Sequence, residues 1–241
     1  APEHLIDWQG KDWTPDCGRP AAHPNARFTV SAAQCPSISP EWENPEGVPI
    51  DAMLLGGRRP NTVPLVVESK DWAHGVFLGS IMGSEITAAT ISNNIGQVRR
   101  DPFAMLPFAG YHMSDYLAHW LQVPNWLNEQ VLPRVYHVNW FRKGADGRFL
   151  WPGFGDNVRV LAWIMSRLQG RVEALDTPIG LMPQPEDLDV SCLSPVPDLD
   201  QLLRVDREAW QQEAALIKKH YQALDRLPDE LNKMLEELEN H

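Results

Sequence analysis

The chain contains 241 residues, of which 43% are hydrophobic, so it is long enough to bury one large core or two small ones. Its net charge of -11 opposes binding to nucleic acid, because proteins that bind polyanions usually carry a basic face. The sequence has no apolar run of roughly 18 residues, no features of a signal peptide at its start, and only three cysteines without paired spacing, so we expect a soluble cytoplasmic protein with free thiols and no membrane contact.

The first 46 residues are rich in proline, tryptophan and polar residues, and they lack clear periodicity. This composition predicts extended loops rather than an independent domain. Asn25 and Arg27 occupy alternate positions of the stretch HPNARF, so both would lie on one side of an extended segment and could grip a small dianion together. The alternative is an ordinary polar loop.

A strand-rich region follows, with strands predicted over residues 50–55, 62–67 and 75–81 from their apolar and β-branched content. The first strand runs into Gly56-Gly57-Arg58-Arg59-Pro60. Two guanidinium groups just past a buried strand suit phosphate, because the planar fork of arginine donates paired hydrogen bonds to phosphate oxygens. The alternative is an exposed arginine pair in a turn.

The stretch Ser84-Glu85-Ile86-Thr87 resembles a capping box and favours the start of a helix. Turn-forming residues follow at 92–96, so the sequence predicts a mobile segment before Asp101 that could act as a lid.

Helical spacing over residues 114–123 and a buried strand over 134–140 lead into a loop that carries three phenylalanines. Phe141, Phe149 and Phe154 alternate with glycines, which keep the backbone in loops. Asn157 follows with an amide that can pair with the edge of a base. Aromatic faces and an amide together suit a purine; the alternative is that the rings belong to the core.

The remainder is predicted to be helical, with a helix over residues 158–168 that Gly170 ends, a proline-dense connector over 178–197 and two terminal helices, the second beginning at Pro228. The whole order indicates an α/β protein. The histidines and cysteines show no zinc spacing, so no metal ligand is assigned. The pattern GxxxxGK[ST] of a phosphate loop is absent from the sequence.

Several motifs in this order resemble those of the GTP-dependent phosphoenolpyruvate carboxykinases, and the closest resemblance is to actinobacterial members. They are HPNARF at 23–28, QCP at 34–36, WENPEGVPI at 42–50, GGRRP at 56–60, DPFAM at 101–105, HVNWFRK at 137–143 and FLWPGFGDN at 149–157. The resemblance covers nearly the whole chain. It implies an enzyme that converts oxaloacetate and GTP to phosphoenolpyruvate, GDP and CO2 in gluconeogenesis, with Mn2+ or Mg2+ as cofactor.

The resemblance also assigns roles to matching positions. It implies that Asn25 and Arg27 bind the substrate and that Arg27 also meets the phosphoryl group being transferred. Arg58 would contact the nucleotide phosphates, so Arg27 and Arg58 are the catalytic candidates. The guanine would lie among four residues, Phe141, Phe149, Phe154 and Asn157.

Residues 84–96, with Ser84, Glu85 and Thr87 at their start, would form the family's lid. The family usually has arginine before Ser-Glu and Ala-Glu after Thr-Ala-Ala, whereas this chain has Gly83 and Thr90-Ile91. We therefore expect altered lid closure.

The implied fold is the mixed sheet of the carboxykinase C-terminal lobe with a helical C-terminal tail, without the N-terminal lobe that carries the phosphate loop and metal ligands. We divide the chain into a substrate-side segment at 1–46, a nucleotide-binding sheet region at 47–140, and a guanine loop with helical region at 141–241. The chain alone is expected to be inactive and to need the N-terminal portion as its partner, while the intact enzyme is expected to be a monomer.

Two other classes of function remain open. The first is a non-catalytic remnant that binds guanine nucleotides or a partner protein. The second is a carbohydrate-binding module, suggested by 10 tryptophans whose faces could stack on sugars. The helical tail and the dense motif match favour the carboxykinase interpretation over both.

Overall fold

The computed structural model describes residues 4–23, 26–27, 29–86, 97–127 and 131–240. The chain separates into two compact units, Ala1–Pro49 and Ile50–His241. In the first unit, the described backbone forms two short 3-10 turns, Pro15–Cys17 and Ala32–Gln34, and an ion pair of 2.7 Å joins Arg19 to Asp7. No helix of the described residues is long and apolar enough to cross a membrane.

The second unit is built on a five-stranded sheet with the order β1-β5-β2-β7-β6. β1 runs parallel to β5, and the other neighbours are antiparallel, so the sheet is mixed. Its strands are β1 (Ala52–Gly56), β2 (Val66–Glu68), β5 (Arg134–Val138), β6 (Leu175–Thr177) and β7 (Gly180–Met182). A separate hairpin pairs β3 (Gly83–Glu85) with β4 (Val98–Arg100).

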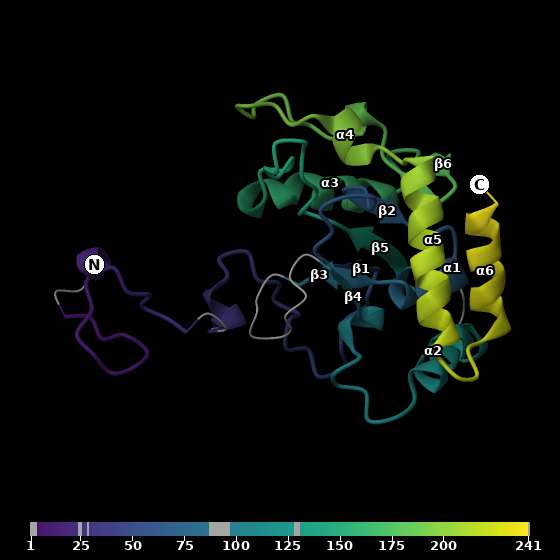
Figure 1. Ribbon diagram of the computed structural model, residues 1–241, viewed down its shortest axis with the longest axis horizontal. Coiled ribbons are helices and arrows are strands. Elements are labelled where there is room, and N and C mark those ends of the chain that lie inside the picture. Colours follow the sequence, from purple (N-terminus) through teal and green to yellow (C-terminus); the bar gives the residue numbers. More distant parts are fainter. Residues whose placement is uncertain (1–3, 24–25, 28, 87–96, 128–130, 241) are drawn as a thin grey trace. The chain divides into compact units, whose positions relative to one another are not determined.

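Helices cover both faces of the sheet (Figure 1). They are α1 (Trp72–Ser80), α2 (Met113–Gln122), α3 (Asn157–Leu168), α4 (Leu199–Leu203), α5 (Arg207–Gln222) and α6 (Asp229–Glu239). Because successive side chains of a strand point to opposite faces, Val66 and Val67 of β2 enter different cores. Val66 packs with Trp163 of α3, and Val67 packs with α1, α5 and α6.

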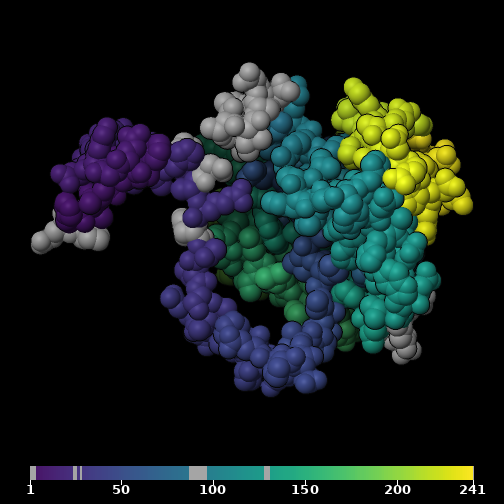
Figure 2. Space-filling view, turned by 90° about the horizontal axis from the view of Figure 1, so that it is seen from below, coloured from purple at the N-terminus to yellow at the C-terminus, as the bar shows by residue number. Residues whose placement is uncertain are grey.

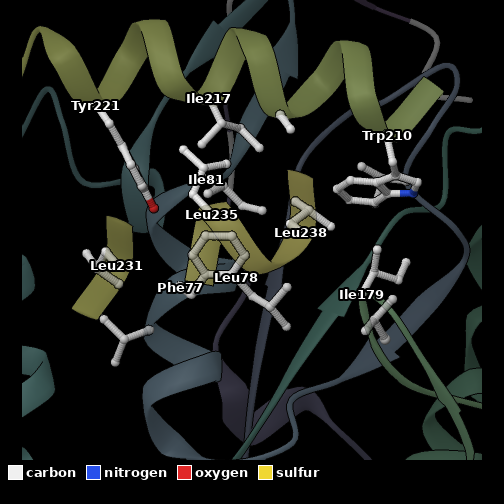
Figure 3. Close-up of a cluster of buried hydrophobic side chains, with 14 of the residues drawn as sticks. Phe77, Leu78, Ile81, Ile179, Trp210, Ile217, Tyr221, Leu231, Leu235 and Leu238 are labelled. Carbon is white, nitrogen blue, oxygen red and sulfur yellow. The ribbon is translucent and has the colours of Figure 1, made fainter. Parts of the chain in front are cut away.

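The larger core lies between α1 and the two C-terminal helices. Figure 3 shows Trp210, Ile217 and Tyr221 directed from α5 toward side chains of α1 and α6. The apolar stripe of α6 (Leu231, Leu235 and Leu238) completes the cluster, and truncating one such leucine to alanine typically costs about 2–5 kcal/mol. In the space-filling view the yellow C-terminal segment lies against the teal segment that contains α2 (Figure 2).

Much of the expected secondary structure is confirmed. Strands form where residues 50–55 and 134–140 predicted them, and helices form at 114–123, at 158–168 and in the tail. Of the strand expected over 62–67, only Val66 and Val67 lie in a strand, β2, which continues to Glu68. The connector expected over 178–197 contains β7, whose hairpin with β6 the proline count concealed.

The strand expected over residues 75–81 was wrong, because residues 75–80 belong to α1 and Ile81 is its C-cap. Its apolar run has no polar face, since the helix is buried between β5, α5 and α6. Asp71 caps the helix by accepting a hydrogen bond from the His74 N–H at 2.7 Å. Gly75 permits close contact with the sheet, because a Cβ there would lie 2.7 Å from Cγ2 of Val135.

The capping box expected at Ser84 was also wrong. Ser84 and Glu85 lie in β3 and pair with Arg99 and Val98 of β4. The segment forms a strand rather than a helix because its backbone N–H and C=O groups find hydrogen-bond partners in β4 and in the segment that follows β1.

Candidate functional site

Three segments meet at the end of β1: the arginine loop (residues 57–60), strand β3, and the start of the aromatic loop (residues 141–157). The Arg58 N–H donates to Ser84 Oγ at 3.1 Å, and the Arg58 carbonyl accepts from the Glu85 N–H at 2.7 Å. Gly57 allows this approach, because a Cβ there would lie only 2.4 Å from the Gly83 carbonyl oxygen. The first turn after β1 is therefore fixed against the expected lid segment.

The two arginines of the arginine loop have different environments. Arg58 is exposed, and within the described residues its guanidinium has no partner. Arg59 is 3% exposed and donates two hydrogen bonds of 2.7 Å to the two carboxylate oxygens of Glu213 on α5. The sequence presented them as an equivalent pair, but Arg58 alone is available to a ligand.

Glu213 is shared with Arg100 of β4, whose Nη1 lies 2.7 Å from Glu213 Oε1. Burial acts to raise the pKa of the Glu213 carboxyl, but hydrogen bonds and charges from Arg59 and Arg100 outweigh burial and lower it. Glu213 is therefore ionised, and the cluster of Glu213, Arg59 and Arg100 ties α5 to the arginine loop and to the β3–β4 hairpin.

The aromatic loop brings two of its three predicted phenylalanines together. An antiparallel bridge between Lys143 and Phe149 folds the loop back, and the rings of Phe141 and Phe149 then lie 5.9 Å apart at 75°. Lys143 Nζ lies 5.5 Å from the centre of the Phe149 ring. Phe149 is 58% exposed, which is high for a ring that serves only packing.

Phe154 stands apart from this pair. Its side chain is 99% exposed, and no ring contact joins it to the aromatic residues that the structure describes. Its φ of 41° lies in the left-handed region, which is strained for a residue with a bulky side chain. A strained backbone that presents an apolar ring to solvent is typical of ligand clamps.

Asn157 is the first residue of α3. Its Oδ1 accepts a hydrogen bond of 2.9 Å from the indole N–H of the buried Trp151. This bond fixes the amide and leaves Nδ2, for which the described residues provide no partner, free to donate to a ligand oxygen.

The lid prediction falls mostly outside the described residues, because Thr87 and the rest of 87–96 are not among them. Ser84 and Glu85 are described, and Glu85 Oε2 lies 3.9 Å from Lys143 Nζ. At Gly83 a Cβ would lie 2.7 Å from Cγ1 of Val98, so this strand pairing suits glycine and crowds a larger residue at position 83.

The substrate-side candidates lie in the first unit. Arg27 is exposed, and Asn25 lies outside the described residues. In the described ranges, no group of three or more His, Cys, Asp and Glu side chains could hold a metal ion. The described side chains thus do not fit a metal centre, and no chemical step is assigned to one.

Two residues of the site were missed by the sequence reasoning. Asn139, which follows β5, is fully buried and hydrogen-bonds both loops. Glu213 could have been found, because it lies three residues after Trp210 and four before Ile217 and thus on the buried stripe of α5. A carboxylate on such a stripe indicates a buried cation opposite it.

The comparison with known proteins agrees with this architecture, which is an α/β domain with helices on both faces of a mixed sheet. The family model described as the phosphoenolpyruvate carboxykinase C-terminal P-loop domain matches residues 1–241. The chain therefore belongs to the GTP-dependent phosphoenolpyruvate carboxykinase family, as the motifs predicted.

Three relatives illustrate the match. The phosphoenolpyruvate carboxykinase [GTP] of Treponema pallidum (strain Nichols) is 53% identical over 245 residues, which cover 98% of this chain and 40% of the relative. That of Arthrobacter sp. (strain FB24) is 48% identical over 239 residues, covering 98% and 39%. That of Corynebacterium efficiens is 49% identical over 211 residues, covering 87% and 34%. The chain thus spans about 40% of the length of such relatives.

Proposed function

We propose that the second unit binds GTP as the nucleotide-binding part of a phosphoenolpyruvate carboxykinase (GTP). Phe141, Phe149 and Phe154 hold the guanine, and Asn157 Nδ2 donates to its edge. Arg58 binds the phosphates. The observation that carries the proposal is the hydrogen-bonded junction of the arginine and aromatic loops. Among the described residues the Arg58 guanidinium has no partner, and the rings of Phe149 and Phe154 are exposed.

The chemistry of the residues supports these roles. Base stacking on an aromatic side chain contributes roughly 1–3 kcal/mol and works through a ring face that solvent can reach. Phe149 and Phe154 meet that condition. A guanidinium without a partner can bind phosphates without first breaking an ion pair. Arg59 would have to give up its ion pair with Glu213 to do so.

We propose the remaining roles on the strength of family membership. The parent protein would convert oxaloacetate and GTP to phosphoenolpyruvate, GDP and CO2, with Asn25 and Arg27 binding the substrate and residues 84–96 forming the lid. In the intact enzyme, Mn2+ or Mg2+ would neutralise phosphate charge, held by residues that are not in this chain. The fold would be the C-terminal lobe of that enzyme, with the regions 1–46, 47–140 and 141–241 serving substrate, nucleotide and guanine.

Catalysis would require more than these 241 residues, because relatives of this name are about two and a half times as long. We therefore propose that the chain alone binds nucleotide without turnover. Formation of phosphoenolpyruvate by the purified chain, supplied with oxaloacetate, GTP and Mn2+, would contradict this.

Calorimetric titration of the chain with GTP and with ATP tests nucleotide binding. We expect GTP to bind more tightly, and Phe154→Ala to weaken GTP roughly tenfold or more through lost stacking. Phe108→Ala is the matched control, because Phe108 is also an exposed phenylalanine, 74% exposed, outside the aromatic loop. Equal binding of GTP and ATP, or equal loss in both variants, would contradict the guanine site.

A further inference from the structure

Asn139 joins the arginine loop to the aromatic loop through one buried amide. Its Oδ1 accepts from the N–H groups of Arg59 and Phe141, both at 3.2 Å. Its Nδ2 donates to the carbonyls of Arg59 at 2.9 Å and Val63 at 2.8 Å. An asparagine side chain has two donor hydrogens and two acceptor lone pairs, so this one is fully satisfied.

These hydrogen bonds let Asn139 fix the backbone of both loops. Both backbone polar groups of Arg59 bind the same side chain, so the peptide that follows Arg58 is fixed to Asn139. The N–H of Phe141, whose ring belongs to the aromatic loop, binds the other lone pair. The distance between the Arg58 backbone and the Phe141 backbone is therefore set by one side chain that is 0% exposed.

No other side chain of similar shape can make this junction. Leucine would leave three buried backbone contacts and one partly buried contact unmade. Ionised aspartate would face the carbonyls of Arg59 and Val63 without a hydrogen to donate. Buried polar contacts of this kind specify geometry strongly, because the low local dielectric makes an unpaired group costly.

We propose that Asn139 is a positioning residue that couples the phosphate-binding and base-binding ends of the nucleotide site, an inference that rests on the proposed function. A ligand that engages two sites on one rigid body binds more tightly than its separate halves, and the gain depends on the spacing of the sites. Asn139 contributes through that spacing, so its loss weakens a ligand that spans both ends and spares ligands that use one.

The test measures the affinities of three probes for the wild-type chain and for Asn139→Asp. Guanosine reports on the base end, tripolyphosphate reports on the phosphate end, and GTP spans both. By ligand-observed NMR titration, we expect Asn139→Asp to weaken GTP about tenfold while guanosine and tripolyphosphate each change by less than about threefold.

A second readout uses the pH. A protonated aspartate carries one O–H donor, so lowering the pH restores one of the two lost donations. We expect the ratio of GTP affinity to guanosine affinity to recover toward that of the wild-type chain at the same pH. A residue that merely stabilised the fold would not give this recovery.

Ser80→Ala is the matched control, because Ser80 is also 0% exposed and its hydroxyl bonds Phe77 and Tyr221 rather than either loop. It should lower the stability and leave all three affinities unchanged. An equal loss of the three probes in Asn139→Asp, or no loss, would overturn the coupling role. A wild-type chain that binds no GTP would overturn the proposed function and this inference with it.

Discussion

The buried cluster of Arg59, Glu213 and Arg100 and the aromatic loop both contact the arginine loop, but they have opposite physical character. The buried cluster has three charges that are paired with one another inside the protein, with Arg59 and Glu213 below 5% exposed. The aromatic loop has apolar rings that water reaches, with Phe154 at 99%. The first arrangement contributes to folding, whereas the exposed rings of the second bury little apolar surface within the described residues.

Of the changes considered, removal of Glu213 from the buried cluster should lower the free energy of unfolding most. Glu213→Ala leaves the guanidinium groups of Arg59 and Arg100 buried without a counter-charge, and we expect the free energy of unfolding to fall by about 3–5 kcal/mol. Urea unfolding of the chain measures this.

The control for that change lies on the neighbouring position of α5. Gln212 is exposed, so Gln212→Ala should change the free energy of unfolding by less than about 0.5 kcal/mol. If Glu213→Ala cost no more than Gln212→Ala, the cluster would not be a stabilising element.

A weaker effect should follow from pH. His137 of β5 lies in the buried region around this cluster, and burial, aided by the charge of Arg59, lowers its pKa to about 4. The unfolded chain therefore takes up a proton near pH 6.5 that the folded chain refuses. The stability that comes from keeping His137 neutral is fully present above pH 6.5. It is lost as the pH falls toward 4, by on the order of 1 kcal/mol of unfolding free energy per pH unit.

Urea unfolding at about pH 7.5, 6.5 and 5.5 measures how steeply the free energy of unfolding changes with pH. His137→Gln should reduce that slope by the part that the uptake of one proton contributes. Part of the slope should remain in that variant, because burial also lowers the pKa of His74 to about 4. An identical slope in wild type and His137→Gln would show that the imidazole of His137 is not kept neutral by the fold.

The same contrast explains what the sequence could predict. Strands β1 and β5 and helices α2, α3, α5 and α6 were predictable because their apolar positions repeat with the period of one element. Helix α1 was not, since its residues 75–80 are buried on all sides and their apolar run has no period. The β6–β7 hairpin was hidden by the prolines around it.

At the site, the residue types were predictable and their environments were not. Arg58 and Arg59 are adjacent and chemically alike, and only Glu213, 154 positions away from Arg59, decides which of them is buried. Asn139 gave no signal because its four partners are backbone groups, which every residue carries. Long-range pairing therefore separates the exposed arginine from the buried one.

The smallest expected effect on stability belongs to Phe154, and it decides between a ligand-binding ring and a core ring. Truncating a 99% exposed ring removes almost no buried area, and alanine keeps the same Cβ at the strained φ of 41°. We expect Phe154→Ala to change the free energy of unfolding by less than about 0.5 kcal/mol, whereas Phe77→Ala, in the core against α5 and α6, should cost about 3–5 kcal/mol. If Phe154→Ala destabilised the chain as Phe77→Ala does, the Phe154 ring would pack within the protein and could not stack on a nucleotide base. A stable variant that has lost GTP binding would mean that this loop contributes to function and not to folding.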